Sequence, residues 1–144
     1  MMKNYFTITV CSFLILLNSC GNKNTGCEQF SPPDPLLDIV VVDAEGNSLL
    51  GDNGIYKPSN MVFENENGKV ELKYDNGTSK SLKFNIDDVN SGQDYSLKLN
   101  DQETETINMT IEKLDEKCGS YLNVISVKLN GKDIGGVRKI KITK

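Results

Sequence analysis

Alternation of apolar and polar side chains with a period of two dominates this chain from residue 36 onward. Val70, Leu72 and Tyr74, for example, alternate with Glu71 and Lys73. The same alternation recurs in residues 82–86, 95–99, 107–111, 125–129 and 140–142. A period of two buries one face of a β-strand and leaves the other in water. The pattern therefore predicts antiparallel sheets with one wet face.

Turn residues separate the predicted strands. Asn67-Gly68 and Asn76-Gly77 lie between residues 61–64, 69–74 and 81–86. Because Asn-Gly adopts the positive φ angles of a tight hairpin, we expect these three strands to form a meander. Asn130-Gly131 predicts another such turn.

The mature chain offers little helical pattern. We expect at most one helical turn, over residues 113–117, and seven to nine short strands. Prolines in residues 31–35 exclude a helix there and lead into a first strand over residues 36–43. The predicted fold class is all-β, an antiparallel β-sandwich over residues 36–144.

The amino terminus has the layout of an export signal. Lys3 lies in a short polar start, and a 13-residue apolar run follows in residues 5–17. This run is shorter than the ~20 residues that a permanent transmembrane helix needs. The alternative, a buried helix of a cytosolic protein, would require a polar face that the run lacks. Residues 1–19 are therefore interpreted as a cleaved signal peptide.

The sequence Leu17-Asn18-Ser19-Cys20 resembles the lipobox of bacterial lipoproteins. This resemblance implies that Cys20 carries the lipid and anchors the mature protein to a membrane, with residues 20–35 as anchor and tether. Three acyl chains would hold a domain almost permanently, at about 0.8 kcal/mol per buried methylene. Residues 21–26 contain no acid. By the same resemblance, this absence favours an outer-membrane anchor that faces the periplasm.

Of the four cysteines, two are expected to form a disulfide bond. Cys11 leaves with the signal and Cys20 is lipidated, so Cys27 and Cys118 remain. In an oxidising periplasm, such a pair is most simply a disulfide. The alternative, a redox or metal pair, calls for C-x-x-C spacing or further ligands.

Two further resemblances concern the domain itself. Residues 40–50, with Val42-Asp43 and Gly46 before Leu49-Leu50, are similar to the opening of prealbumin-like and carboxypeptidase-regulatory-like domains. The whole layout resembles small lipoproteins of the Bacteroidota that have no assigned activity. These resemblances imply an immunoglobulin-like or prealbumin-like sandwich and name no ligand.

Charge and composition exclude some partners. The formal net charge is −4, and basic residues are interleaved with acids along the predicted strands. Nucleic acid requires a basic stripe, so we expect no nucleic-acid partner. The chain also lacks histidine, the commonest general base and metal ligand, and tryptophan.

Polar residues in the predicted loops include candidate calcium ligands. Asp43, Glu45, Asp52 and Asn53 could surround calcium, but the EF-hand spacing fails, so solvated turns are the better interpretation.

Two further sets of residues are candidates for a catalytic role. Asp87-Asp88 and Glu103/Glu105 could supply a glycosidase carboxylate pair, although an acidic chain offers such pairs by chance. Gly119-Ser120 does not have the G-x-S-x-G spacing of a nucleophile elbow.

We therefore expect no enzyme, no cofactor and no metal site. The predicted function is a non-enzymatic binding or interaction module, anchored through Cys20, with an envelope protein as its possible partner. The alternative is a small periplasmic inhibitor, for example of lysozyme, or a ligand-binding accessory protein. The glycine-bracketed residues 51–54 are the candidate loop for inhibition.

Overall fold

A computed structural model describes Cys27 and residues 30–144 of the chain. The chain divides into a unit that ends at Phe30 and a domain that spans Ser31–Lys144. Within the first unit, the Phe30 amide donates to the Cys27 carbonyl at 3.0 Å. The predicted signal peptide, residues 1–19, and the predicted lipid site, Cys20, lie outside the described residues. No helix in the described part is long and apolar enough to cross a bilayer.

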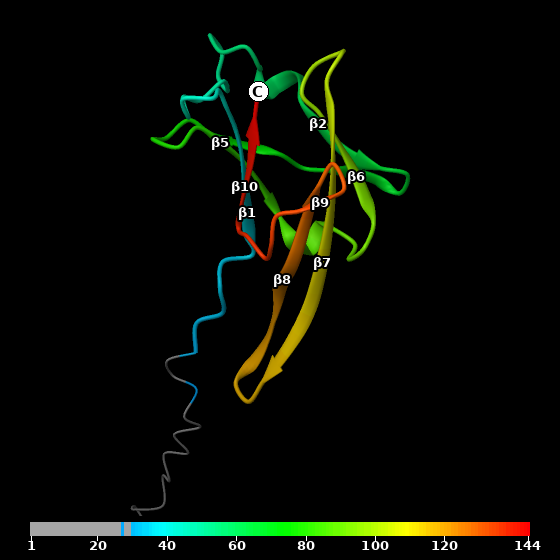
Figure 1. The fold of residues 1–144 in the computed structure, drawn as a ribbon. Helices are drawn as coiled ribbons and strands as arrows, with labels where there is room; N and C mark the ends of the chain where they lie inside the picture. The colour runs from blue at the N-terminus through cyan, green and yellow to red at the C-terminus, as the bar shows by residue number, and fades with distance from the viewer. Residues whose placement is uncertain (1–26, 28–29) are drawn as a thin grey trace, which may run out of the picture. The chain divides into compact units, whose positions relative to one another are not determined.

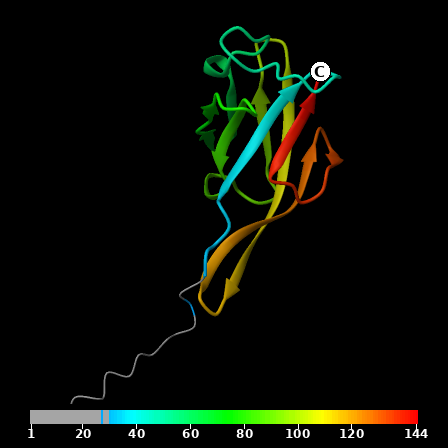
Figure 2. The same cartoon turned by 90° about the vertical axis from the view of Figure 1, so that its left-hand side faces the viewer.

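The domain consists of two β-sheets (Figures 1 and 2). The four-stranded sheet has the order β10-β1-β5-β4, and the six-stranded sheet has the order β3-β2-β6-β7-β8-β9. Neighbouring strands are antiparallel except β1 and β10, which are parallel. The first sheet contains β1 (Leu36–Val42), β4 (Lys73–Asp75), β5 (Ser81–Asn85) and β10 (Lys139–Thr143). The second contains β2 (Val62–Asn65), β3 (Gly68–Val70), β6 (Asp94–Lys98), β7 (Thr104–Glu116), β8 (Gly119–Leu129) and β9 (Lys132–Asp133).

The helical content of the described part is two single 3₁₀ turns, η1 (Pro58–Asn60) and η2 (Ile86–Asp88). The all-β prediction is confirmed at this level.

One hydrophobic core joins the two sheets. Leu37, Ile39 and Val41 of β1 are completely buried, as are Ile107 and Met109 of β7. Between the sheets, the rings of Phe63 (β2) and Phe84 (β5) lie 5.1 Å apart, a separation typical of favourable tilted ring contacts.

The predicted meander of three strands is wrong. β2 and β3 form a hairpin in the six-stranded sheet, whereas β4 pairs with β5 in the other sheet. The chain changes sheets between Val70 and Lys73, where Leu72 packs against the core. The alternation continues through β3 and β4, because the inner faces of both sheets pack on the same core and the same alternate residues stay buried when the chain crosses from one sheet to the other.

The predicted turns differ in outcome. Asn130 and Gly131 have φ angles of 51° and 79° and connect β8 to β9, as predicted. The β4–β5 connection is longer than a two-residue turn. It runs over residues 76–80 and ends at Lys80, whose φ is 39°.

Two further predictions from the sequence are wrong in the β7–β8 hairpin. Residues 113–116 continue β7 as strand, and the turn lies at Lys117 and Cys118, so no helical turn forms there. A β-bulge pairs Thr110 with Ser126 but Ile111 with Val124, which leaves Ile125 as the extra residue. Ile125 is therefore 46% exposed instead of facing the core.

Candidate functional site

The candidate site lies where β1 ends, and it is built around residues 49–56, called the glycine loop below. Leu50 and Tyr56 are the buried stems of this loop, at 1% and 3% exposure. The Tyr56 amide donates to the Leu49 carbonyl at 3.0 Å, and the Gly51 amide donates to the Tyr56 carbonyl at 3.1 Å. These bonds close the loop on itself and hold its ends in the core.

Glycines at two positions determine the loop conformation. Gly51 has a φ of 144°, and its neighbour across the loop, Gly54, donates to the Gly51 carbonyl at 3.0 Å. A Cβ on Gly54 would lie 2.5 Å from the Leu49 carbonyl oxygen and 2.9 Å from the Gly51 nitrogen. Only glycine fits there, because both contacts are with backbone atoms that cannot move aside.

The tip of the glycine loop presents Asp52, Asn53 and Ile55 to solvent, and Ile55 is 71% exposed. Beside it lies a hollow of about 280 Å³ whose other wall is the β4–β5 loop, with Tyr74, Asn76 and Lys80 among its lining residues. Lys80 ends this wall with a φ of 39°, and its amide donates to the Gly77 carbonyl at 3.2 Å.

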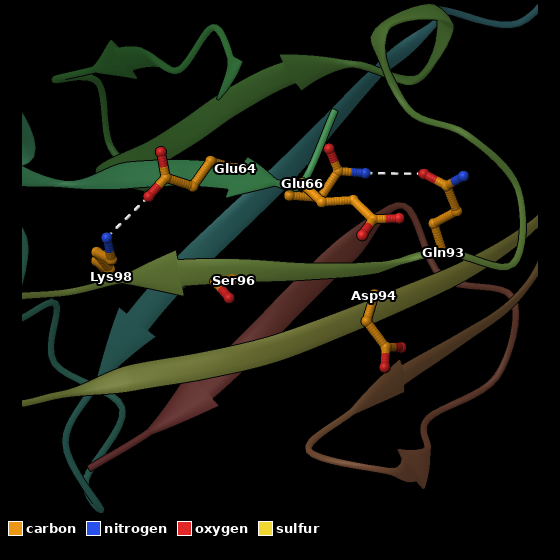
Figure 3. A pocket seen from close by; sticks show the side chains of 7 residues that line it. Glu64, Glu66, Gln93, Asp94, Ser96 and Lys98 are labelled. Atoms are coloured by element: carbon orange, nitrogen blue, oxygen red, sulfur yellow. Dashed lines mark hydrogen bonds and ion pairs between the residues drawn. The ribbon is translucent and has the colours of Figure 1, made fainter. Parts of the chain in front are cut away.

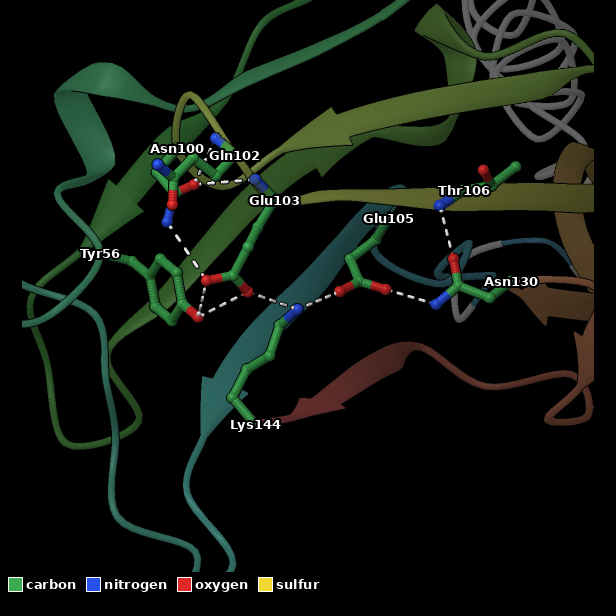
Figure 4. Close-up of polar contacts among 8 residues, drawn as sticks. All are labelled: Tyr56, Asn100, Gln102, Glu103, Glu105, Thr106, Asn130 and Lys144. Atoms are coloured by element: carbon green, nitrogen blue, oxygen red, sulfur yellow. Dashed lines mark hydrogen bonds and ion pairs between the residues drawn. The ribbon is translucent and has the colours of Figure 1, made fainter.

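A polar network holds the buried stem of the glycine loop (Figure 4). The Tyr56 hydroxyl donates to Glu103 at 2.9 Å, and the Lys144 ammonium lies 2.7 Å from the same carboxylate. Lys144 also pairs with Glu105, which accepts a further hydrogen bond from the Asn130 amide. In Figure 4 the ammonium of Lys144 lies between the two carboxylates.

The electrostatics of the network favour its charged form. Hydrogen bonds from Lys144 and then Tyr56 lower the pKa of Glu103 below its ordinary value. Burial alone would lower the pKa of Lys144, but hydrogen bonds and attraction to Glu103 and Glu105 raise it to about 12. Burial, followed by the hydrogen bond to Glu103, raises the pKa of Tyr56.

Glu103 and Glu105 are therefore close together, but they share one ammonium. A glycosidase needs one carboxyl group that donates a proton and one that acts as base or nucleophile. Here both carboxylates bind the Lys144 ammonium. Glu103 also accepts a hydrogen bond from the Tyr56 hydroxyl, and Glu105 accepts one from the Asn130 side-chain amide. Their observed role is to join the glycine loop, β7 and the residue that follows β10.

The candidate calcium ligands do not form a cluster of metal-binding side chains. The two oxygens of the Asp43 carboxylate accept from the backbone and side-chain amides of Asn47, at 2.7 and 2.9 Å. These bonds, the side-chain one first, lower the pKa of Asp43. Asp52 and Asn53 lie at the glycine-loop tip, and no metal-binding group of His, Cys, Asp and Glu occurs in the described residues.

The remaining sequence candidates lie in local structure. Asp87 and Asp88 are exposed in η2, where the Asn85 side chain accepts from the Asp87 amide at 3.0 Å. Ser120 is exposed in β8 opposite Asp115. Cys27 and Cys118 are both disulfide-bonded, which is compatible with the predicted bridge.

Sequence reasoning missed a polar hollow of about 570 Å³ on the outer side of β2 and β6 (Figure 3). At one end, Lys98 and Glu64 form an ion pair at 2.8 Å, and this hydrogen bond lowers the pKa of Glu64. At the other end, Asn65 donates to Gln93 at 2.8 Å. Only the pairing of β2 with β6 brings these residues together, so local patterns could not reveal the hollow.

The chain matches no protein-family model, no curated protein and no solved structure.

Proposed function

We propose that this protein is a lipid-anchored bacterial envelope lipoprotein whose β-sandwich is a non-enzymatic binding module. In this proposal residues 1–19 are a cleaved signal peptide, Cys20 carries the lipid, and the domain faces the periplasm from the outer membrane. The sandwich is of immunoglobulin-like or prealbumin-like type, and a Cys27–Cys118 bridge fastens the tether to it.

Two observations support export. The lipobox-like sequence at Leu17 to Cys20 follows an apolar run of signal-peptide length. The disulfide-bonded state of Cys27 and Cys118 agrees with an oxidising compartment, because such bonds are rare in the cytosol.

The close packing and internal hydrogen bonds of the glycine loop are the observation that carries the binding role. Gly54 excludes any other residue sterically, and Tyr56 ties the loop to Glu103 and thereby to Lys144. A loop that is already ordered loses little conformational entropy when it binds a partner. Glu103, one of the candidate catalytic acids, accepts the hydrogen bond from Tyr56 and thereby supports this loop.

The binding role can be tested by affinity purification from crosslinked envelopes. The wild-type chain should enrich at least one envelope protein over an unrelated lipoprotein of similar abundance. Enrichment of nothing beyond that control would contradict the proposal.

The same loop favours inhibition as a second candidate function, because an exposed loop whose stems are buried can enter an active-site cleft. The purified domain should then inhibit a lysozyme, and Gly54→Ala should weaken the inhibition by distorting the loop. Unchanged lysozyme activity at a large molar excess of the domain would contradict this candidate.

A further inference from the structure

We infer that the free edge of β10 binds an extended acidic segment of another protein, which adds a strand to the four-stranded sheet. This inference goes beyond the proposed binding role of the glycine loop and uses a different surface. Its failure would therefore leave that proposal standing.

β10 is the longest of the strands that end the two sheets. It has five residues, whereas β3 and β4 have three each and β9 has two. Very short end strands are one way in which proteins prevent their sheet edges from pairing with other chains. Figure 2 shows β10, in red, beside β1, in cyan. Of the four sheet ends, this one is therefore best suited to accept a further strand.

The hydrogen bonds at the two ends of β10 show which of its backbone groups β1 uses. The Asp38 amide donates to the Arg138 carbonyl at 2.9 Å. At the other end, the Lys144 amide donates to the Val42 carbonyl at 2.9 Å. In a parallel ladder, alternate residues of a strand bond to the same neighbour. Given the β1–β10 register, the even-numbered residues of β10 bond to β1, and the odd-numbered residues direct their N–H and C=O groups away from it.

The odd-numbered residues of β10, Lys139, Lys141 and Thr143, therefore form a free edge. In the described part of the chain, β10 pairs with no strand except β1, and no other hydrogen bond reaches these N–H and C=O groups. Donors and acceptors alternate along such an edge at the spacing of a β-ladder. Their complement is another extended backbone, because a bound anion would meet the carbonyl oxygens as well as the amides.

The lysine side chains of this edge determine which strand suits it. Lys139 and Lys141 are exposed, and neither forms an ion pair within the described residues. A second copy of the edge would bring like charges together across the new ladder, which is unfavourable. A strand with Glu or Asp at alternate positions would attract both lysines instead. The edge thus disfavours self-association and suits an acidic segment.

The test is photocrosslinking of the full chain in intact cells, with p-benzoylphenylalanine at the exposed Thr143. Lys141→Pro removes one outward N–H and adds a ring on the open side, so it should reduce the Thr143 adduct by about fivefold or more. Lys141→Gln, which keeps the N–H, should retain more of the adduct than Lys141→Pro. Lys139→Glu should also reduce the adduct, because it repels an acidic strand. Lys128→Glu, at an exposed lysine of β8, is the charge-matched control and should leave the adduct unchanged.

Amide hydrogen exchange of the purified variants controls for folding. Protection of the Ile140 and Ile142 amides should equal that of wild type, which shows that β10 remains paired with β1. If Lys141→Pro loses this protection, Lys139→Glu decides the test, since it changes no backbone group.

The inference is supported if the adduct depends on Lys139 and, where β10 stays paired, on the Lys141 N–H, and if the crosslinked peptide is an acidic segment of another protein. An adduct with a second copy of this chain, with lipid or with glycan would overturn it. An adduct insensitive to Lys139→Glu, or no Thr143 adduct at all, would also overturn it. The affinity purification described above tests the binding role separately, so the two proposals can fail independently.

Discussion

Lys144, which follows the last strand of one sheet, places its ammonium 2.7 Å from the carboxylate of Glu103, which precedes β7 of the other sheet. The same ammonium pairs with Glu105, whose side chain is only 8% exposed. One lysine thus joins the two sheets beside the buried stem of the glycine loop. Screening by water weakens exposed ion pairs, but the Glu105 side of this network is largely shielded from it.

Lys144→Met should lower the free energy of unfolding by about 1 to 3 kcal/mol, because it leaves the buried Glu105 carboxylate without its cation. Urea denaturation at neutral pH measures the change. Lys141→Met is the matched control, since Lys141 is exposed on β10 and should change stability little. Equal losses in the two variants would contradict the role of Lys144.

The network also predicts how stability depends on pH. The folded pKa of Glu103 is below its ordinary 4.5, so its stabilisation is present above that value and lost as the pH falls. The folded pKa of Lys144 is raised from 10.5 to about 12, so its stabilisation is present below 10.5 and lost as the pH rises. Asp43, Glu64 and Asp75 also have lowered pKa values. Acid therefore also removes stabilisation that comes from these three carboxylates, outside the Lys144 network.

Comparison with Lys144→Met isolates the contribution of the network to that profile. The urea midpoint of wild type should exceed that of the variant most between about pH 5 and 10. The difference between the two proteins should shrink as the pH falls below 4.5, where Glu103 loses the stabilisation that its lowered pKa represents. A difference that stays constant over this range would show that packing, and not charge, carries the effect of Lys144.

Gly54→Ala should destabilise the domain by about 1 to 3 kcal/mol, the usual cost of forcing an atom into occupied space. The reason is the 2.5 Å approach of the added carbon to the Leu49 carbonyl oxygen. Gly77→Ala is the control, because its nearest contact is the movable Asp75 carboxylate. Thermal melts of both variants check the prediction, and equal melting temperatures would show that the backbone around Gly54 can accommodate the added carbon.

The sequence predicted the strands better than their partners. Alternation identified most strand positions, because a half-buried strand needs only local information. It could not show that residues 69–74 divide between two sheets, since both sheets bury the same alternate residues at Val70 and Leu72. It also placed Ile125 in the core, because a β-bulge changes which residues point inward without changing composition.

The candidate site was predictable only in part. The glycine bracket at Gly51 and Gly54 identified the loop directly from its turn residues. Glu103 and Glu105 also stood out, but as a possible catalytic pair. Their partner Lys144 is about 40 residues away in the chain, and only the register of β7 and β10 in two separate sheets brings it to them. Long-range pairing of this kind has no local sequence signal.

Cys20→Ala should release the protein from membranes into the soluble envelope fraction. The proposed lipid on Cys20 supplies the attachment, since burial of acyl chains contributes about 0.8 kcal/mol per methylene. Metabolic labelling with a palmitate analogue should mark the wild type and not the variant, with Cys27→Ser as a control that keeps its label. Label retained on Cys20→Ala would contradict the anchor assignment.

Replacement of Cys27 or Cys118 by serine should lower the free energy of unfolding by about 2 to 5 kcal/mol while the β-sheet spectrum survives at low temperature. The bridge restricts the unfolded chain, whereas the core around Phe63 and Phe84 lies in the sheets and does not depend on it. Because one bridge is lost in either single variant, the double variant should be no less stable than the singles. Thiol titration of the denatured, unreduced mature protein should find no free cysteine, and a non-reduced digest should join the two cysteine peptides. Two reactive thiols, or losses that add in the double variant, would show that Cys27 and Cys118 do not pair with each other.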